Sequence, residues 1–251
     1  MRIAVVSDIH GNLTALEAVI ADLRETGVDL VVHGGDLLSG GGARSAAVVD
    51  RIRELKWPGV YGNAEEMCWA PHRVSEALQR PELHRIRDVV LSHTIPTTLR
   101  EVGDERLEWL KTLPLRWSNG EVAVVHAAPD DAWHFTPADA PDEELERVYS
   151  VLGASVVVYG HIHQPFVRRL ASPAAAPAKR GRFTVVNSGA VSLSFDGDPR
   201  ASYALIDGND VEIRRVAYDV DEEIRLLRNS DDPFAPSTIE TLRTGRYVAL
   251  T

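Results

Sequence analysis

Hydrophobic residues in the first part of the chain follow two alternating spacings. A run of apolar residues at 3–6 precedes a segment at 13–23 in which leucine and isoleucine recur every three or four positions. The run is typical of a strand buried on both faces, and the recurring spacing is typical of an amphipathic helix. The pattern repeats with a strand at 28–36, a helix at 43–55 and a short strand at 59–63. This alternation predicts a core of parallel strands.

The middle of the chain is predicted to be mostly helical. The segment from about residue 65 to residue 113 is interrupted by Pro71, Pro81 and Pro96, and we interpret it as a helical cap inserted before the next strand. The alternation of strands and helices then resumes, with a strand at 121–129, an amphipathic helix at 142–152 and a buried strand at 155–163.

The later part of the chain has a different pattern. Short strand-like runs follow one another with turn residues and no helix between them, at 166–170, 183–189, 202–208 and 210–218. This predicts antiparallel strands in a second sheet beside the first. Residues 171–181 are small, proline-rich and basic, and we expect them to form a mobile hairpin tip. Two short helices at 219–229 and 236–245 are expected to pack on the outside.

Composition narrows the possible classes of protein. The 251 residues are 44% hydrophobic and 25% charged, which suits one globular domain over 1–251 with a small cap. A net charge of −10 argues against extended nucleic-acid binding. Cys68 is the only cysteine, so a disulfide framework and a metal site built from thiolates are excluded. The lack of disulfides favours a location in the cytoplasm. No segment has the length and composition of a membrane span or a signal-peptide core.

Side chains that can bind metal ions lie at the ends of the predicted strands. Each has an ordinary explanation when taken alone, such as a turn cap or a histidine at the rim of the core. Taken together they converge, because the carboxyl ends of parallel strands share one edge of a sheet. Their number suits two ions that share one carboxylate better than a single tetrahedral ion. The seven residues are Asp8, His10, Asp36, Asn63, His126, His161 and His163.

The order of the motifs SDIHGN, HGGD, YGN, VVH and GHIH resembles that of the calcineurin-like metallophosphoesterase superfamily, over most of the chain. The later block VVNSGAVSLSFDGDPRASYALID is similar to a motif of the small bacterial and archaeal phosphodiesterases of that superfamily. The fold that we expect is α/β: a four-layer αββα sandwich of two mixed β-sheets flanked by helices, with the small helical cap as an insertion.

The resemblance implies a role for each candidate residue. Asp8, His10 and His163 would hold the first metal ion, and Asn63, His126 and His161 the second. Asp36 would bridge both ions, and with Asn63 and His126 it would form the catalytic group. Ligands without a thiolate suit manganese, which we favour, as well as iron, zinc or nickel. The helix that begins near Asn12 would direct its N-terminus toward a bound anion.

Two ions about 3.5–4 Å apart can activate a bridging hydroxide and stabilise the displacement at phosphorus. We therefore expect hydrolysis of a small phosphate ester or nucleotide, with no protein nucleophile. Ala64 stands where many members of the superfamily have a histidine that assists the leaving group. Such assistance is worth about 100- to 10,000-fold, so we expect a preference for phosphodiesters or other esters with good leaving groups.

Further residues are expected near the predicted site. Asn12, His93 and His134 are candidates for substrate binding, and either histidine is a candidate replacement for the missing proton donor. Trp133 and Phe135 would either cover the metal ions as part of a lid at 130–141 or anchor that loop, and the area that aromatic rings bury favours anchoring.

Two further functions remain open at this point. The chain could be a nucleotide sensor with weak catalysis, or a protein-binding scaffold that keeps the phosphoesterase fold, because Ala64 removes a catalytic group. Retention of all seven ligands favours the enzyme. Oligomeric state is not predicted.

Overall fold

The fold contains two β-sheets that face each other. The computed structural model describes residues 1–38, 44–170 and 183–249, and the hairpin tip predicted at 171–181 lies outside these residues. The first sheet has the order β2-β1-β8-β9, formed by Leu30–His33, Arg2–Val6, Ala201–Asp207 and Asp210–Val216. The second has the order β3-β4-β5-β7-β6, formed by Arg116–Ser118, Val122–Val125, Val156–Tyr159, Phe183–Asn187 and Phe166–Leu170.

Both sheets are mixed. In the first, β1 is parallel to β2 and antiparallel to β8. In the second, β4, β5 and β7 are parallel, while β3 and β6 pair antiparallel at the two edges. The expectation that the later strands form a separate antiparallel sheet is therefore wrong in detail. The later strands divide between the sheets because β8 pairs with the N-terminal strand β1, whereas β7 extends the parallel pairing of β5.

The short strand predicted at residues 59–63 is also absent from the described sheets. Only one parallel bridge forms, between His33 and Gly59. Pairing stops there because the next residues turn away from the sheet, and the backbone N–H of Tyr61 donates to the carbonyl oxygen of Pro114 instead. This departure from the sheet carries Asn63 to the start of a helix.

Nine α-helices in the described residues surround the sheets. They are α1 (Leu13–Thr26), α2 (Ser45–Leu55), α3 (Asn63–Trp69), α4 (His72–Ala77), α5 (His84–Val89), α6 (Ile95–Leu110), α7 (Asp142–Tyr149), α8 (Val220–Arg228) and α9 (Ala235–Thr244). Short helical turns lie at Pro81–Leu83, Val90–Thr94 and Ser150–Leu152. Helices α3 to α6 thus occupy the segment interpreted as a cap. None of the helices in the described part of the chain has the length and apolarity needed to cross a membrane.

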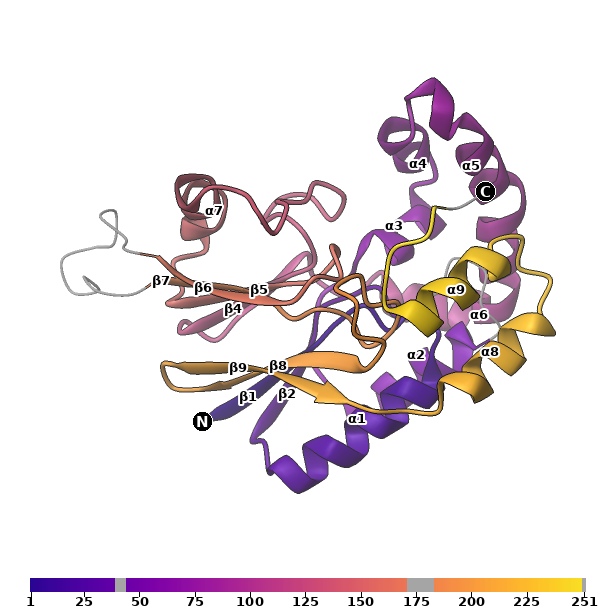
Figure 1. The fold of residues 1–251 in the computed structure, drawn as a ribbon. Coiled ribbons are helices and arrows are strands. Elements are labelled where there is room, and N and C mark those ends of the chain that lie inside the picture. The colour runs from indigo at the N-terminus through magenta and orange to yellow at the C-terminus, as the bar shows by residue number, and fades with distance from the viewer. Residues whose placement is uncertain (39–43, 171–182, 250–251) are drawn as a thin grey trace.

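Alternating side chains of the central strands separate the layers. In β1, Ile3 and Val5 pack between the two sheets, while Ala4 and Val6 pack against the helices that cover the first sheet. Helices α1 and α2 cover this outer face, and α7 covers the outer face of the second sheet (Figure 1). Strands buried on both faces explain the continuous apolar runs in the sequence. The resulting order of helix, sheet, sheet and helix confirms the four-layer αββα sandwich.

Candidate metal centre

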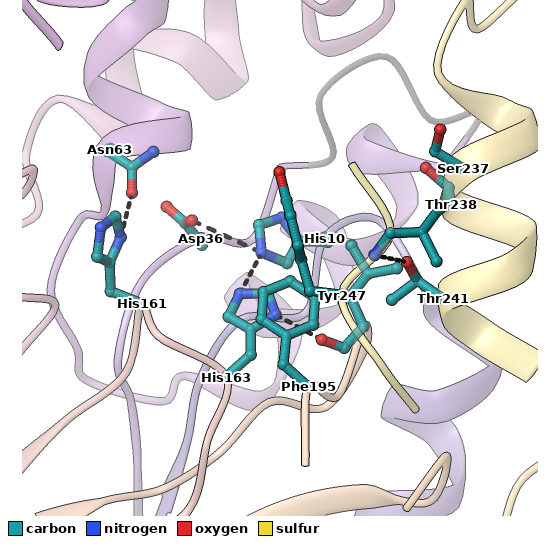
Figure 2. Close-up of a pocket in the computed structure, with 12 residues that line it drawn as sticks. His10, Asp36, Asn63, His161, His163, Phe195, Ser237, Thr238, Thr241 and Tyr247 are labelled. Atoms are coloured by element: carbon teal, nitrogen blue, oxygen red, sulfur yellow. Dashed lines mark hydrogen bonds and ion pairs between the residues drawn. The ribbon is translucent and has the colours of Figure 1, made fainter. Parts of the chain in front are cut away.

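Five of the seven candidate ligands line one cavity, and the other two, Asp8 and His126, are buried next to them. Of the seven, five follow the carboxyl ends of β1, β2 and β5, His126 follows β4, and Asn63 is the first residue of α3. Figure 2 shows the side chains of His10, Asp36, Asn63, His161 and His163 directed toward one another from separate parts of the chain. The parallel strands of each sheet end at this edge, so short loops are sufficient to bring these side chains together.

The backbone is strained at most of these positions. Of the seven non-glycine residues with positive φ in the described chain, five are candidate ligands: Asp8, His10, Asp36, His161 and His163, with φ of 57°, 49°, 50°, 65° and 55°. This region is unfavourable for residues with a Cβ, and such strain persists only where the surrounding structure holds it. Two backbone N–H groups, those of Ile9 and His10, donate to the carbonyl oxygen of Asp36 at 2.9 Å and hold two of the loops together.

The first ligand group contains Asp8, His10 and His163. The Nε2 atoms of the two histidines are 3.1 Å apart, and Nε2 of His163 is 3.2 Å from Oδ1 of Asp8. The Nδ1 atoms face the carbonyl oxygens of Leu38 and Leu193 at 3.2 and 2.7 Å. A carbonyl oxygen can only accept, so each Nδ1 carries a proton, and in the neutral form of each ring the Nε2 lone pair is directed at the other ring. A cation between them would satisfy both lone pairs.

The second group contains Asp36, His126 and His161, with Asn63 beside them. Oδ1 of Asn63 is 2.9 Å from Nε2 of His126 and 2.8 Å from Nδ1 of His161. Nδ1 of His126 donates to the carbonyl oxygen of Gly34 at 2.9 Å, which leaves Nε2 of the neutral ring as an acceptor. An amide oxygen and a bare imidazole nitrogen therefore face each other, an arrangement that a metal ion stabilises.

Asp36 lies between the two groups. Its Oδ2 is 3.6 Å from Nε2 of His10, whereas its Oδ1 is 3.4 Å from Nε2 of His126. The backbone N–H of Ala64 donates to Oδ1 at 2.8 Å and helps to fix the orientation of the carboxylate. The donor atoms thus fit two divalent ions with one shared carboxylate, and the oxygen and imidazole ligands are those of first-row transition metals.

Burial and neighbouring charges determine the protonation of the histidines. Burial, followed by the charge of a neighbouring histidine, lowers the pKa of His10 and of His161 to about 3. These two rings are therefore neutral and able to bind metal at neutral pH. Burial also acts on His126 and His163, but the carboxylates of Asp36 and Asp8 outweigh it and raise the pKa of both rings.

The two aspartates respond differently to the same surroundings. Burial alone would raise the pKa of Asp8, but the charge of His163 and its hydrogen bond outweigh burial, so the pKa lies below its usual range. Burial raises the pKa of Asp36, against the opposing effect of His126. A carboxylate that is disfavoured in the metal-free protein gains most from nearby cations, which suits a position between two ions.

Glu65 supports this centre and was not identified from the sequence. Its buried carboxylate accepts hydrogen bonds from the backbone N–H groups of Asp36 at 2.8 Å, Leu38 at 3.0 Å and Gly62 at 2.7 Å. Burial and the charge of Asp36 raise the pKa of Glu65 to about 7. Glu65 is the third residue of α3, the position of the acid in a capping box. This position is the one signal in the sequence that could have indicated its role.

The three residues predicted to bind substrate lie elsewhere. Asn12 caps α1: its Oδ1 accepts from the N–H of Ala15 at 2.9 Å, and its Nδ2 donates to Oγ of Ser192 at 3.1 Å. His93 lies in the helical turn Val90–Thr94 and interacts electrostatically with Asp232. His134 is exposed beside Asp131. None of the three is among the described residues that line the cavity at the ligands, so we do not assign them a role.

The two aromatic residues of the loop after His126 have different environments. The indole N–H of Trp133 donates to Oε2 of Glu66 at 2.7 Å, and the ring packs against the main core, so Trp133 anchors the loop as expected. Phe135 is 50% exposed, and its ring lies 5.6 Å from that of His161. Of the two rings, that of Phe135 is therefore the one that is exposed to solvent beside a candidate ligand.

Comparisons with known proteins identify the family of this chain. The model of the calcineurin-like phosphoesterase superfamily domain matches residues 1–210. An uncharacterised protein of Methanocaldococcus jannaschii, MJ0912, is 29% identical over 231 residues, which are 87% of this chain and 88% of that protein.

Two solved structures are similar over nearly the whole chain. A metallophosphoesterase from Sphaerobacter thermophilus is 28% identical with a TM-score of 0.75, over 98% of this chain and 99% of its own. The hypothetical protein PH1004 from Pyrococcus horikoshii OT3 has the same fold, with 20% identity and a TM-score of 0.74 over 98% and 99% of the two chains. The chain belongs to the calcineurin-like phosphoesterase superfamily, a family of metal-dependent phosphate-ester hydrolases.

Proposed function

We propose that this protein is a dinuclear-metal phosphoesterase that hydrolyses phosphodiesters or other activated phosphate esters. The observation that carries the proposal is the position of Asp36, whose two carboxylate oxygens face different ligand groups at 3.6 and 3.4 Å. Two divalent ions, of which we favour manganese, would supply positive charge for the phosphoryl oxygens and a water molecule activated near neutral pH. The single cysteine suits a cytoplasmic location.

The chain's own residues would hold this centre in place. Asp8, His10 and His163 would bind one ion, and Asn63, His126 and His161 the other, with Asp36 shared. The Nδ1–H groups that donate to backbone carbonyls keep each Nε2 of His10, His126 and His163 available as a ligand. Glu65 holds the backbone on both sides of Asp36 and would act as a positioning residue.

The substrate preference follows from Ala64. This buried residue lies in the first turn of α3, where its N–H contacts Asp36, and its methyl group cannot donate a proton to a departing alkoxide. Without that assistance, stable anions such as aryloxides or phosphates leave most readily. We therefore propose aryl phosphodiesters or pyrophosphate links as substrates, in preference to alkyl monoesters.

Metal analysis combined with turnover tests the proposal. The purified protein is loaded with manganese, its metal content is measured, and hydrolysis of bis-p-nitrophenyl phosphate is followed. We expect two ions per chain and metal-dependent turnover. Asp36→Asn should lose at least one ion and reduce turnover more than 100-fold, whereas Asp50→Asn removes an aspartate that pairs with Arg106 on the surface and should change neither property.

The alternatives predict other results. A sensor or a scaffold would bind two ions but show no turnover of mono-, di- or pyrophosphate esters. A protein that binds fewer than two ions per chain under saturating manganese would contradict the dinuclear centre itself.

A further inference from the structure

The wall of the metal cavity contains residues that lie beyond the matched superfamily domain. The cavity has a volume of about 250 Å³ and is lined by five of the candidate ligands. The domain match ends at residue 210, yet α9 and the segment that follows it supply further lining residues: Ser237, Thr238, Thr241, Tyr247 and Val248. Figure 2 shows Ser237, Thr238 and Thr241 on the side of the cavity opposite Asn63 and His161. The C-terminal region therefore helps to shape the site.

Hydrogen bonds fix the position of this C-terminal segment. Gly245 ends α9 with a φ of 62°, its N–H donates to the carbonyl oxygen of Thr241 at 2.8 Å, and its own carbonyl accepts from Gly197 at 2.7 Å. The chain then turns back along α9, where the N–H of Val248 donates to Oγ1 of Thr241 at 3.3 Å. Tyr247 lies between these two attachment points, so its ring is held at the cavity although it is 62% exposed.

Aromatic rings connect the two ligand groups to the cavity wall. The ring of Phe195 stacks on that of His163, with centroids 4.5 Å apart and an angle of 19°. Tyr247 meets Phe195 edge to face at 5.3 Å. On the other side, Phe135 lies 5.6 Å from His161. Rings thus extend outward from a ligand of each proposed ion.

A second cavity continues from the first along these rings. It has a volume of about 430 Å³, and it shares His161, Phe195 and Tyr247 with the metal cavity. Phe135, Ile162 and Gln164 are among its other lining residues, and none of its described lining residues is Asp, Glu, Lys or Arg. This size and a largely apolar lining with one amide are typical of sites for small organic groups, which occupy roughly 300–1,000 Å³.

We propose that this aromatic subsite, formed by Phe135, Phe195, Tyr247 and Gln164, binds the flat aromatic group of a phosphate ester whose phosphate lies at the metal centre. The proposal rests on the proposed function and adds the class of substrate. Stacking on aromatic side chains suits any flat ring, whether a nucleobase or an aryl group. The side-chain amide of Gln164 can both donate to and accept from the edge of a base.

Two matched pairs of ligands test the subsite without any need for turnover. Phenylphosphonate is compared with ethylphosphonate, and thymidine 5′-monophosphate with deoxyribose 5-phosphate, by isothermal titration calorimetry of the manganese-loaded protein. Within each pair the anionic group is the same and only the aromatic group differs. We expect the aromatic member to bind about tenfold more tightly, which corresponds to about 1.4 kcal/mol. A preference in only one pair identifies the aryl group or the nucleobase as the occupant.

Variants of Tyr247 test whether its aromatic ring causes the tighter binding of the aromatic ligands. Tyr247→Ala should reduce the difference within each pair to less than threefold, while Tyr247→Phe keeps the ring and should preserve the difference. Val151→Ala removes another exposed apolar side chain, in the helical turn Ser150–Leu152, and should have no effect. If Tyr247→Phe weakens binding as much as Tyr247→Ala, the hydroxyl group rather than the ring contacts the ligand, and stacking is refuted.

Turnover of bis-p-nitrophenyl phosphate, measured on the same samples, separates this inference from the proposed function. Turnover with equal affinities within both pairs overturns the aromatic subsite and leaves the phosphoesterase. A preference for the aromatic ligands without turnover keeps the subsite and overturns the hydrolase. Equal affinities without turnover overturn both.

Discussion

Replacing Glu65 by alanine removes the acceptor of three buried backbone N–H groups at once. These groups belong to Asp36, Leu38 and Gly62 and lie 2.8, 3.0 and 2.7 Å from the carboxylate. A buried donor without a partner costs about 1–3 kcal/mol, and the alanine also leaves a void. Loss of a buried charge relieves its desolvation and offsets part of this cost. We expect Glu65→Ala to lower the free energy of unfolding by about 3–5 kcal/mol.

Urea denaturation of the metal-free protein, followed by circular dichroism, measures this change. Domains have free energies of unfolding of about 5–15 kcal/mol, so Glu65→Ala can remain folded but will be strongly destabilised. Glu65→Gln, which keeps the volume and one acceptor oxygen, should lose about half as much. Its neighbour provides a matched control, because Glu66 is half-buried and accepts from the indole of Trp133. Glu66→Ala should cost about 1 kcal/mol.

A small loss of stability would contradict this reasoning. If Glu65→Ala costs less than 1 kcal/mol, or no more than Glu66→Ala, the three hydrogen bonds do not stabilise the fold. Metal content then gives a second measurement, because the same carboxylate holds the backbone of Asp36. We expect Glu65→Gln to bind the second manganese ion at least tenfold more weakly than the unchanged protein.

Three further predictions concern residues around the centre. At Gly62, a Cβ would lie 2.2 Å from Oδ1 of Asp36, so Gly62→Ala should lose at least one ion by metal analysis; retention of two ions would contradict the required close approach. Burial lowers the pKa of His33 from 6.5 to about 4, so the unfolded chain takes up this proton first and stability falls as pH drops from 6.5 to 4, by about 3 kcal/mol. His33→Leu should reduce that fall in urea denaturation of the metal-free protein at pH 7 and pH 4.5, and an unchanged fall would exclude His33 as its source. Ala64→His should accelerate esters with poor leaving groups most, and an unchanged dependence of rate on leaving-group pKa would refute the missing proton donor.

The strand ends were predictable because their pattern is local. Apolar runs such as residues 3–6 and 155–159 indicate buried strands, and the side chains that follow them must emerge at the edge of the sheet. This placed Asp8, His10 and His161 correctly relative to the strands. The resemblance of five short motifs to one superfamily then indicated the four-layer fold, which the structure confirms.

Other features depended on contacts between distant segments. The later strands were assigned to the wrong arrangement because local pattern does not determine which strand pairs with which, and β8 pairs with β1 about 200 residues earlier in the chain. The role of Glu65 escaped prediction for the same reason, since two of its three donors lie more than 25 residues away. Asn12, a predicted substrate ligand, caps its helix, and its contact with Ser192, 180 positions later, also joins distant segments.

The sequence by itself determined which chemical groups the protein has and, for six of the seven candidate ligands, at which strand ends they lie, because the periodicity of hydrophobic residues specifies where strands end. Only the tertiary structure decided how these groups combine. His10 and His163 are separated by 153 positions and meet at 3.1 Å, and Tyr247 reaches the same cavity from the C-terminal segment. Such contacts depend on how whole helices and strands pack and on strained loops that only the folded chain can hold. No local sequence pattern encodes either of them.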